Sequence, residues 1–424
     1  MITVVNTIPP ERMPALARSR SADSILSKFA RRAVWVLPLM LALRGPNLPA
    51  ADAGFYRVST PTNQVRLNFA ANGTLSWNGA PGGFSVEKST DLSLGTWAPW
   101  ARGTSFTSTA SIKVHDFASP AGMVFIPAGY FTMGDIFGDT QTVALPVHPV
   151  FVSAFYMDKF DVTQERMRQV LQWAYNAGKL TVTSTNVMNA EGTGQVLLQL
   201  YPNAWDAILN FANGQFSIRA DSPFRTNHPC VWVPWYGAVA FCNYLSQMEG
   251  LPVCYDLTNW TCDFTATGYR LPTEAEWEKA ARGGPEGYRF PWTNTNNTIT
   301  HAQADYKSTT NFAYDVNPTQ GFNPAGGTIP PFTTPVGYFA PNGYGLYDMS
   351  GNVWQWVWDY GVVRYQTGDS VQFDPTGFSS GNRVFRGGSW LTVASATTVA
   401  SRYIGYPPTF AYDDVGFRIA RKAP

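Results

Sequence analysis

The segment "RVFRGGSWLTVASATTVASRY", residues 383–403, holds the turn on which the fold assignment depends. Two adjacent glycines, Gly387 and Gly388, stand before Ser389 and Trp390, an order that suits a tight turn at the entrance to a site. The residues after Trp390 carry no charge until Arg402. The segment therefore has the frame of an active site, but it contains no obvious catalytic group.

The composition indicates a loop-rich globular chain with many buried rings. Of 424 residues, 15% are aromatic and only 14% are charged, and there are 37 glycines and 31 prolines. Residues 1–50 carry seven Arg or Lys and two Asp or Glu, so the remaining chain has a net charge of −4. Nucleic acid and anionic membrane surfaces require a basic patch, so we expect neither as a partner.

Residues 1–53 are predicted to be a leader that contains a signal peptide. Arg31 and Arg32 precede the eleven-residue apolar run "AVWVLPLMLAL", and small residues follow at 48–54. A basic flank, a short apolar run and small residues are typical of a cleaved secretory signal. A bilayer span needs ~20 residues. We therefore expect a secreted or periplasmic/extracellular protein with no membrane span in the mature chain; an N-terminal anchor is the alternative.

The cysteines permit disulfide bonds in an exported protein. Cys254 and Cys262 flank "CYDLTNWTC", where "TN" can turn a hairpin, and we predict that these two residues pair. The pairing of Cys230 and Cys242 is left open. No CxxC spacing occurs, so a zinc site is not expected.

The rest of the chain divides near residue 120. Residues 54–118 alternate polar and apolar side chains between turn signals, which predicts a small β-rich, sandwich-like accessory module. Residues 121–424 predict an α+β domain with short helices within 161–178, 233–250 and 272–284. The capping signals are Thr163, Pro234 and the Thr273–Glu276 capping-box pair, and Asn213-Gly214 predicts a hairpin turn.

Six blocks of the second domain occur in an order that resembles the sulfatase-modifying-factor family, named for the formylglycine-generating enzyme. The resemblance covers about residues 121–421 and implies that family's variant of the C-type lectin fold. The blocks are "IPAGYFTMGD", "HPCVWVPWYGAVAFC", "YRLPTEAEWEKAARGG", "PNGYGLYDMSGNVWQW", "RVFRGGSW" and "GFRIAR".

The resemblance also implies where catalysis would take place. The family's active members oxidise a sulfatase cysteine to formylglycine with copper held by two cysteine thiolates after the "GGS" turn. The matching positions here are Thr392 and Thr397, and Ser389 matches the family's active-site serine. Hydroxyls are poor ligands for Cu(I), and no cysteine follows Cys262, so copper is not expected. Ser389 is alternatively a turn serine that bonds the nearby backbone.

Calcium is the second cofactor that the resemblance implies. One set of matching ligand positions is Asp348, the carbonyls of Gly351 and Val353, and Gln355, where the family usually has a glutamate. A second set is Asp305 with the Tyr306 carbonyl. Hard oxygens suit Ca²⁺. The alternative for Asp348 is a loop carboxylate that caps backbone N–H groups.

Two further patterns favour structural roles. Trp354, Trp356, Trp358 and Tyr360 recur at period two, which predicts one packed core face of a strand rather than a ligand platform. Glu274 and Glu276 do not face each other on a helix. We expect them to cap the helix and to pair with arginines such as Arg270, Arg282 or Arg418.

Three functions remain. The first is a non-oxidising, exported member of the family that binds a peptide, glycan or protein partner in the inherited groove, where Tyr403, Tyr406, Phe410 and Tyr412 gather. The second is a formylglycine-generating or other oxidase with an unrecognised metal site. The third is a structural or adhesion protein. The first is preferred because the thiol pair is missing while contact-prone rings are present.

Overall fold

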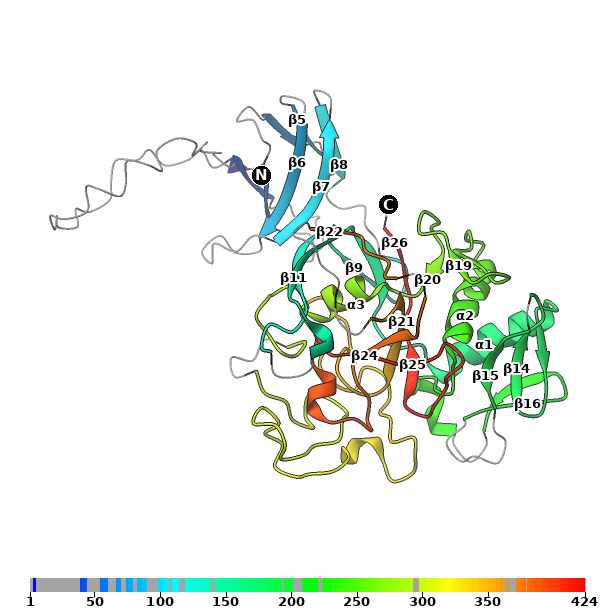
Figure 1. The fold of residues 1–424 in the computed structure, drawn as a ribbon. Coiled ribbons are helices and arrows are strands. Elements are labelled where there is room, and N and C mark those ends of the chain that lie inside the picture. The colour runs from blue at the N-terminus through cyan, green and yellow to red at the C-terminus, as the bar shows by residue number, and fades with distance from the viewer. Residues whose placement is uncertain are drawn as a thin grey trace. The chain divides into compact units, whose positions relative to one another are not determined.

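The computed structural model describes two compact units (Figure 1). The first is Met1–Ala118 with Pro127–Gly129, and the second is Ser119–Ile126 with Tyr130–Pro424. In the first unit the structure describes only the strands up to residue 113, so most of the predicted signal peptide lies outside the described residues. From residue 119 to 423 it describes all positions except 139–141, 193, 201–207, 220–222, 293–296, 363–364, 366–370 and 379.

The first unit is β-rich, as the alternating pattern predicts. Its strands form a five-stranded sheet in the order β1-β2-β3-β6-β7 and a three-stranded sheet in the order β4-β5-β8. All of the pairings given for these two sheets are antiparallel. The strands are β1 Thr3–Val4, β2 Leu39–Leu43, β3 Gly54–Ser59, β4 Arg66–Phe69, β5 Thr74–Asn78, β6 Gly82–Ser89, β7 Ala98–Phe106 and β8 Thr109–Lys113.

Three α-helices of the second unit begin where their capping residues predict. Thr163 Oγ1 accepts a hydrogen bond from the Arg166 amide at 3.2 Å. Pro234 precedes the second helix. Thr273 and Glu276 form the predicted capping box, each side chain accepting from the other's amide. These helices are α1 Gln164–Asn176, α2 Trp235–Met248 and α3 Glu274–Ala281.

The strands of the second unit are short and belong to several small sheets. The largest have the orders β20-β26-β12-β9 and β24-β23-β21-β25. The strands are β9 Met123–Ile126, β10 Gly129–Met133, β11 His148–Val152, β12 Phe155–Asp158, β13 Leu180–Val182, β14 Asn186–Asn189, β15 Val196–Gln199, β16 Leu209–Ala212, β17 Gln215–Ile218, β18 Tyr255–Asp256, β19 Thr261–Cys262, β20 Tyr269–Arg270, β21 Trp354–Tyr360, β22 Gln372–Phe373, β23 Arg383–Arg386, β24 Arg402–Tyr406, β25 Val415–Phe417 and β26 Ala420–Lys422.

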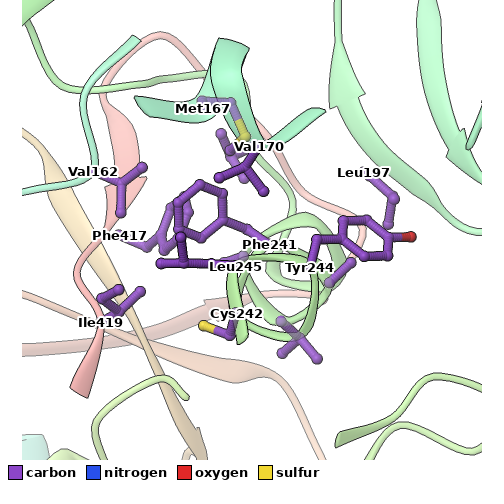
Figure 2. Packing of buried hydrophobic residues seen from close by; sticks show 14 of the residues in the cluster. Val162, Met167, Val170, Leu197, Phe241, Cys242, Tyr244, Leu245, Phe417 and Ile419 are labelled. Carbon is purple, nitrogen blue, oxygen red and sulfur yellow. The ribbon is translucent and has the colours of Figure 1, made fainter. Parts of the chain in front are cut away.

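The larger hydrophobic core lies between α1, α2 and the C-terminal strands (Figure 2). Met167 and Val170 of α1 point toward Phe241 of α2, and the ring centroid of Phe417 lies 5.2 Å from that of Phe241. All four side chains are almost fully buried. Burial of a side chain of this size stabilises the fold by roughly 1.5–3 kcal/mol. This core therefore fixes β25, which begins next to the candidate site.

Strand β21 is central to the sheet that carries the site. It pairs antiparallel with β23 and parallel with β25. Trp354 and Trp356 are buried in the core and Trp358 packs partly buried against it, whereas Tyr360 is only partly buried and lines a pocket, so the packed-face prediction holds in part. Trp356 Nε1 donates to the Val233 carbonyl at 2.9 Å.

Gln355 and Asp359, at alternate positions of the strand, contact α3. Gln355 accepts a hydrogen bond from the Trp277 side chain, and Asp359 accepts one from the Glu274 amide.

Buried ion pairs join α3 to its neighbours. Glu276 pairs with Arg270, as predicted, at 2.6 Å. Glu274 pairs with Arg402 instead of a predicted arginine, and its two oxygens accept at 2.6 and 2.7 Å. Arg402 escaped prediction because it lies far from Glu274 in the sequence and meets it only through β24. Arg386 Nη1 also lies 3.5 Å from Glu274 Oε1, so three guanidinium groups fix the first turn of α3.

The predicted disulfide bond is not formed. All four cysteines lie within the described residues, and all four are free. The hairpin pairs Tyr255 with Cys262, so Cys254 is one position out of register with Cys262. Successive side chains on a strand point to opposite faces, and this register directs the two thiols apart. Cys230 and Cys242 are buried thiols, which answers the question that the sequence left open.

Within the described residues, no helix has both the length and the apolar character that a membrane span requires.

Candidate functional site

The glycine pair produces a turn that no other residue could make without displacement. Gly387 and Gly388 have φ values of 94° and 72°. A Cβ at Gly388 would lie 2.7 Å from Thr397 Cγ2 and 2.9 Å from the Ala396 carbonyl oxygen. The Gly351 amide donates to the Gly387 carbonyl at 2.8 Å. The turn is therefore held between the segment around Gly351 and the short helix that contains Thr397.

Ser389 is fully buried at the base of this turn. Its Oγ donates to Asp414 Oδ2 at 2.6 Å, so it bonds a distant carboxylate rather than only the nearby backbone. Burial raises the pKa of Asp414 to about 6, and the Ser389 hydroxyl opposes that shift. Among the described residues, no hydrogen bond joins this pair to a histidine or lysine side chain. The pair therefore links the turn to the residue that directly precedes β25.

The two threonines at the family's copper positions are occupied by local hydrogen bonds. Thr392 Oγ1 donates to the Ser389 carbonyl at 3.0 Å and accepts from the Ser389 amide at 2.9 Å. Thr397 is fully buried, and its Oγ1 donates to the Ala394 carbonyl at 3.0 Å. Neutral hydroxyls already used in this way cannot supply two soft anionic ligands. The residues present do not fit copper.

A patch of aromatic rings continues from this turn to the surface; we call it the aromatic patch. Tyr406 and Phe410 stack with centroids 3.7 Å apart and planes 7° apart. Tyr403 adjoins Tyr406 at 5.4 Å, and Tyr412 adjoins Phe410 at 6.1 Å. The side chains of Tyr403, Tyr406 and Tyr412 are 39%, 37% and 45% exposed. The structure thus brings together all four rings that the sequence analysis placed in the groove.

The first set of predicted calcium ligands does not assemble as the resemblance implies. Gln355 is fully buried, and its Oε1 accepts from Trp277 Nε1 at 2.7 Å and from Arg418 Nε at 3.1 Å. Its Nε2 donates to the Asp348 carbonyl at 2.8 Å. A side-chain oxygen that already binds a guanidinium cation is unsuited to a second cation. Gln355 is therefore a cross-link between strands in this protein.

The two aspartates from the separate predicted sets are electrostatic neighbours. Both oxygens of Asp305 and the Oδ1 of Asp348 are buried without a hydrogen-bond partner. Burial, with the charge of Asp348 second, raises the pKa of Asp305 well above its ordinary value; burial also raises the pKa of Asp348 to about 6. Thr334 Oγ1 is likewise buried and unpartnered. The Thr334 amide opposes the shift of Asp305, and the Gly337 amide, which donates to Asp348 Oδ2 at 2.7 Å, and then Arg418 oppose that of Asp348.

These oxygens fit a hard cation better than either predicted set. Two carboxylates and a hydroxyl supply the oxygen ligands that calcium prefers. No cluster of three or more His, Cys, Asp or Glu side chains that could hold a metal occurs among the described residues, so any such site has only two charged ligands. The Tyr306 carbonyl accepts from His301 Nε2 at 3.1 Å, which occupies one lone pair of that predicted ligand.

Sequence reasoning missed two of the groups that matter here. Asp414 was not singled out, although "DDVGFR" places it directly before β25. Thr334 lies in the stretch "PFTTPVGYF", which has no pattern that marks an oxygen ligand. Only the parallel pairing of β21 with β25, together with the bridge between Asp305 and Gly351, brings these segments together.

A loop-rich α+β unit with a double-glycine turn, buried Arg–Glu pairs and a deep serine defines a formylglycine-generating-enzyme-like class of protein. The sulfatase-modifying factor enzyme 1-like domain model matches residues 109–423. The chain belongs to this family.

Its relatives include the formylglycine-generating enzymes of Mus musculus, 32% identical over 70% of this chain and 74% of that protein, and of Thermomonospora curvata, 32% identical over 70% and 93%. A Bos taurus relative named inactive C-alpha-formylglycine-generating enzyme 2 is 31% identical over 71% of this chain and 88% of that protein. Among solved structures, Treponema denticola variable protein 1 aligns with a TM-score of 0.49 and 27% identity over 71% of this chain and 95% of that one.

Proposed function

We propose that this protein is an exported, non-oxidising member of the family that binds a peptide segment of a partner protein at the aromatic patch. The exposed rings of the patch carry the proposal. Tyrosine supplies a large contact area at a low cost in conformational entropy, and it is enriched in protein-binding surfaces. The basic and apolar N-terminal pattern supports export.

The chemistry of the turn supports the non-oxidising part of the proposal. Thr392 and Thr397 have no thiolate, and their hydroxyls are engaged with the Ser389 backbone and the Ala394 carbonyl. The four cysteines all precede residue 263. Burial raises the pKa of the Cys230 and Cys242 thiols, which disfavours the thiolate form that binds metals. The name of the Bos taurus relative indicates that the family includes inactive members.

The stacking geometry favours a peptide over a glycan. Sugars pack against open ring faces, but Tyr406 and Phe410 cover each other's faces at 3.7 Å, and the Phe410 and Tyr412 planes differ by only 18°. The faces that Tyr406 and Phe410 turn toward each other are therefore closed to a sugar, and their ring edges remain available. Ring edges accept apolar side chains, and hydroxyls can bond a peptide backbone.

The mature protein is expected not to convert the cysteine of a Cys-x-Pro-x-Arg peptide to an aldehyde. With Cu(I), oxygen and a thiol reductant present, hydrazide trapping and mass spectrometry should detect no product. The physical reason is that Thr392 and Thr397 offer copper neither charge nor softness. A formylglycine-generating relative serves as the positive control. Aldehyde formed by the unmodified protein would overturn the non-oxidising proposal.

Truncation of the aromatic patch is expected to remove peptide binding. Peptides selected from a displayed twelve-residue random library should bind the wild-type protein. Tyr406→Ala should lower the affinity for these peptides at least about tenfold, because a tyrosine buried at an interface is worth about 2 kcal/mol or more. Fluorescence anisotropy with the selected peptides measures the effect.

Tyr338→Ala is the matched control, because Tyr338 is 59% exposed on a different loop and contacts Phe339 rather than the patch. The control should bind like the wild type. If no peptide can be selected, or if Tyr406→Ala and Tyr338→Ala bind equally, the patch is not the peptide site. Binding to a glycan array without peptide binding would replace the peptide with a sugar.

A further inference from the structure

A pocket of about 490 Å³ lies in the second unit between the start of α3, the end of β21, β22 and β24. It is separate from the aromatic patch, because Arg402 and Tyr403 are consecutive on β24 and their side chains point to opposite faces of the sheet. Arg402 lines the pocket, whereas Tyr403 belongs to the patch. A volume of this size is within the range of small-molecule sites.

The guanidinium and one phenol hydroxyl that line the pocket are already used within the protein. Arg402 donates Nε and Nη2 to Glu274 at 2.6 and 2.7 Å, and Nη1 to the carbonyls of Val143 and Val362. The Tyr365 hydroxyl donates to Glu274 Oε1 at 3.3 Å. Glu274 is therefore paired, and the Arg402 guanidinium, the one guanidinium among the described residues that line the pocket, is engaged within the protein.

Two acceptors remain open toward the pocket. Asp359 is 4% exposed, and its Oδ2 accepts from the Glu274 amide at 2.7 Å, whereas no described residue donates to its Oδ1. His148 is 7% exposed, and its Nδ1 lies 2.9 Å from the Pro146 carbonyl. Nδ1 must carry the proton to make that bond, so Nε2 is the acceptor of the neutral ring and has no partner among the described residues.

Gly377 keeps the Asp359 carboxylate uncovered. It has a φ of 77°, and a Cβ there would lie 2.7 Å from Asp359 Cβ and 2.8 Å from Asp359 Oδ1. Two rings stand at the mouth, since Phe373 and Phe378 line the pocket and are 63% and 39% exposed. The pocket therefore combines spare acceptors, a buried carboxyl group that can ionise and aromatic walls.

We propose that this pocket binds a small organic ammonium ion, whose N–H groups donate to Asp359 Oδ1 and His148 Nε2 between the rings of Phe373 and Phe378. A primary ammonium brings three donors and no acceptor, which matches the two spare acceptors, Asp359 Oδ1 and His148 Nε2. Aromatic faces attract such cations further. The inference does not depend on the proposed peptide binding.

The electrostatics of the pocket agree with a cationic ligand. Burial, with the charge of Glu274 second, raises the pKa of Asp359 to about 8. The ionised carboxylate is therefore costly in the free protein, and an ammonium ion would offset that cost by ion pairing. A carboxylate or phosphate ligand would meet Asp359 with no available cation among the described lining residues. A neutral polyol would satisfy the two acceptors but would gain nothing from the charge.

Isothermal titration calorimetry with n-butylammonium tests the proposal on the full chain, at a pH above 8. We expect saturable binding, with n-butanol, the neutral isostere, at least about tenfold weaker because a charge-assisted hydrogen bond is lost. Nα-acetyl-lysine methylamide is the second probe. If it binds as well as n-butylammonium, the source of the ammonium includes lysine side chains, and if it does not, the site takes free amines.

Asp359→Asn should weaken the binding of n-butylammonium at least about tenfold, although the asparagine still offers an acceptor to the Glu274 amide. Asp263→Asn is the control, because Asp263 is a solvent-exposed carboxylate, and it should leave binding unchanged. Gly377→Ala gives an independent variant that covers Asp359 Oδ1 and should also abolish binding. Gly287→Ala is its control, because Gly287 also has a positive φ, 86°, but a Cβ there meets no atom within 4 Å.

Two results would overturn the inference. One is equal binding of n-butanol and n-butylammonium, which would reduce the pocket to an apolar cleft. The other is undiminished binding in Asp359→Asn. Should that variant fail to fold, nuclear Overhauser effects between the butyl protons and the ring protons of Phe373 or Phe378 in the unmodified protein decide the matter; their absence despite binding would place the ligand elsewhere.

Discussion

Calcium is expected to raise the thermal midpoint of the metal-free protein, and Asp305→Asn is expected to abolish that rise. Asp305 and Asp348 bury three carboxylate oxygens without a hydrogen-bond partner, so ionising both carboxyl groups is costly in the free site and a bound cation would offset that cost. A ligand that binds only the native state stabilises it by about 2.7 kcal/mol at a concentration 100 times its Kd. Differential scanning fluorimetry with and without calcium measures the shift.

The effect of Asp305→Asn on thermal stability should change sign when calcium is removed. In the presence of EDTA, Asp305→Asn eliminates one buried charge and should be at least as stable as the wild type, whereas in saturating calcium it should be the less stable protein. Asp414→Asn is the matched control: Asp414 is also buried, but it is bonded to Ser389 and lies outside the oxygen cluster. Its response to calcium should equal that of the wild type.

Magnesium should give a smaller shift than calcium, because it demands near-ideal octahedral geometry and gives up its waters reluctantly. A wild-type midpoint that does not change in saturating calcium would show that these aspartates are neutral loop residues instead. Equal shifts in the wild type and in Asp305→Asn would place the cation at another set of ligands.

The helices and the fold could be predicted from the sequence because their signals are local. Thr163 and the Thr273–Glu276 pair act within one turn of helix, and the structure has both caps. The Asn213-Gly214 turn likewise joins β16 and β17. The six ordered blocks carried the family assignment because a turn such as Gly387-Gly388 tolerates almost no substitution once its neighbours are packed.

The site could be predicted only in part, because its contacts join segments that are distant in the sequence. Thr392 and Thr397 were correctly placed next to the turn, since Thr392 bonds Ser389 and the backbone near Thr397 packs against Gly388. The partnership of Ser389 with Asp414 and the approach of Asp305 to Asp348 depend on strand pairing. No spacing rule reports which of several carboxylates a sheet will bring together.

The disulfide prediction shows the same limit at short range. Cys254 and Cys262 flank a plausible hairpin, and the hairpin exists, but a register in which Tyr255 is opposite Cys262 separates the two thiols. A shift of one residue would have placed them together. Register is decided by packing, here by Tyr255, whose ring stacks on Trp358 at 5.5 Å. That contact is invisible in the segment itself.

Glu278→Gln is expected to cost about 3–5 kcal/mol of unfolding free energy, the usual effect of breaking a buried ion pair. Glu278 is fully buried and bonds two guanidinium groups, Arg282 at 2.6 Å and Arg386 at 2.5 Å, as well as the Gly134 amide at 2.8 Å. The amide of glutamine would keep the volume but remove the negative charge, and its NH₂ group would face a cation. Urea denaturation followed by tryptophan fluorescence measures the loss.

The pH dependence of this difference follows from the same contacts. Burial alone would raise the pKa of Glu278, but Arg282 and Arg386 outweigh it and hold the pKa below the ordinary value. A depressed pKa contributes stability above the pKa of the unfolded chain, about 4.3, and loses it as the pH falls. The wild type and Glu278→Gln should therefore converge in stability in acid.

Glu165→Gln is the matched control, because Glu165 pairs with Arg168 on the surface of α1, with 34% of its side chain exposed. An exposed pair of this kind is worth about 0–1 kcal/mol. Arg386 directly precedes Gly387, so Glu278→Gln should also loosen the turn and weaken peptide binding at the aromatic patch, whereas Glu165→Gln should not. Equal stability losses in the two variants, or a gap that fails to close in acid, would contradict the view that buried charge pairing holds the turn in place.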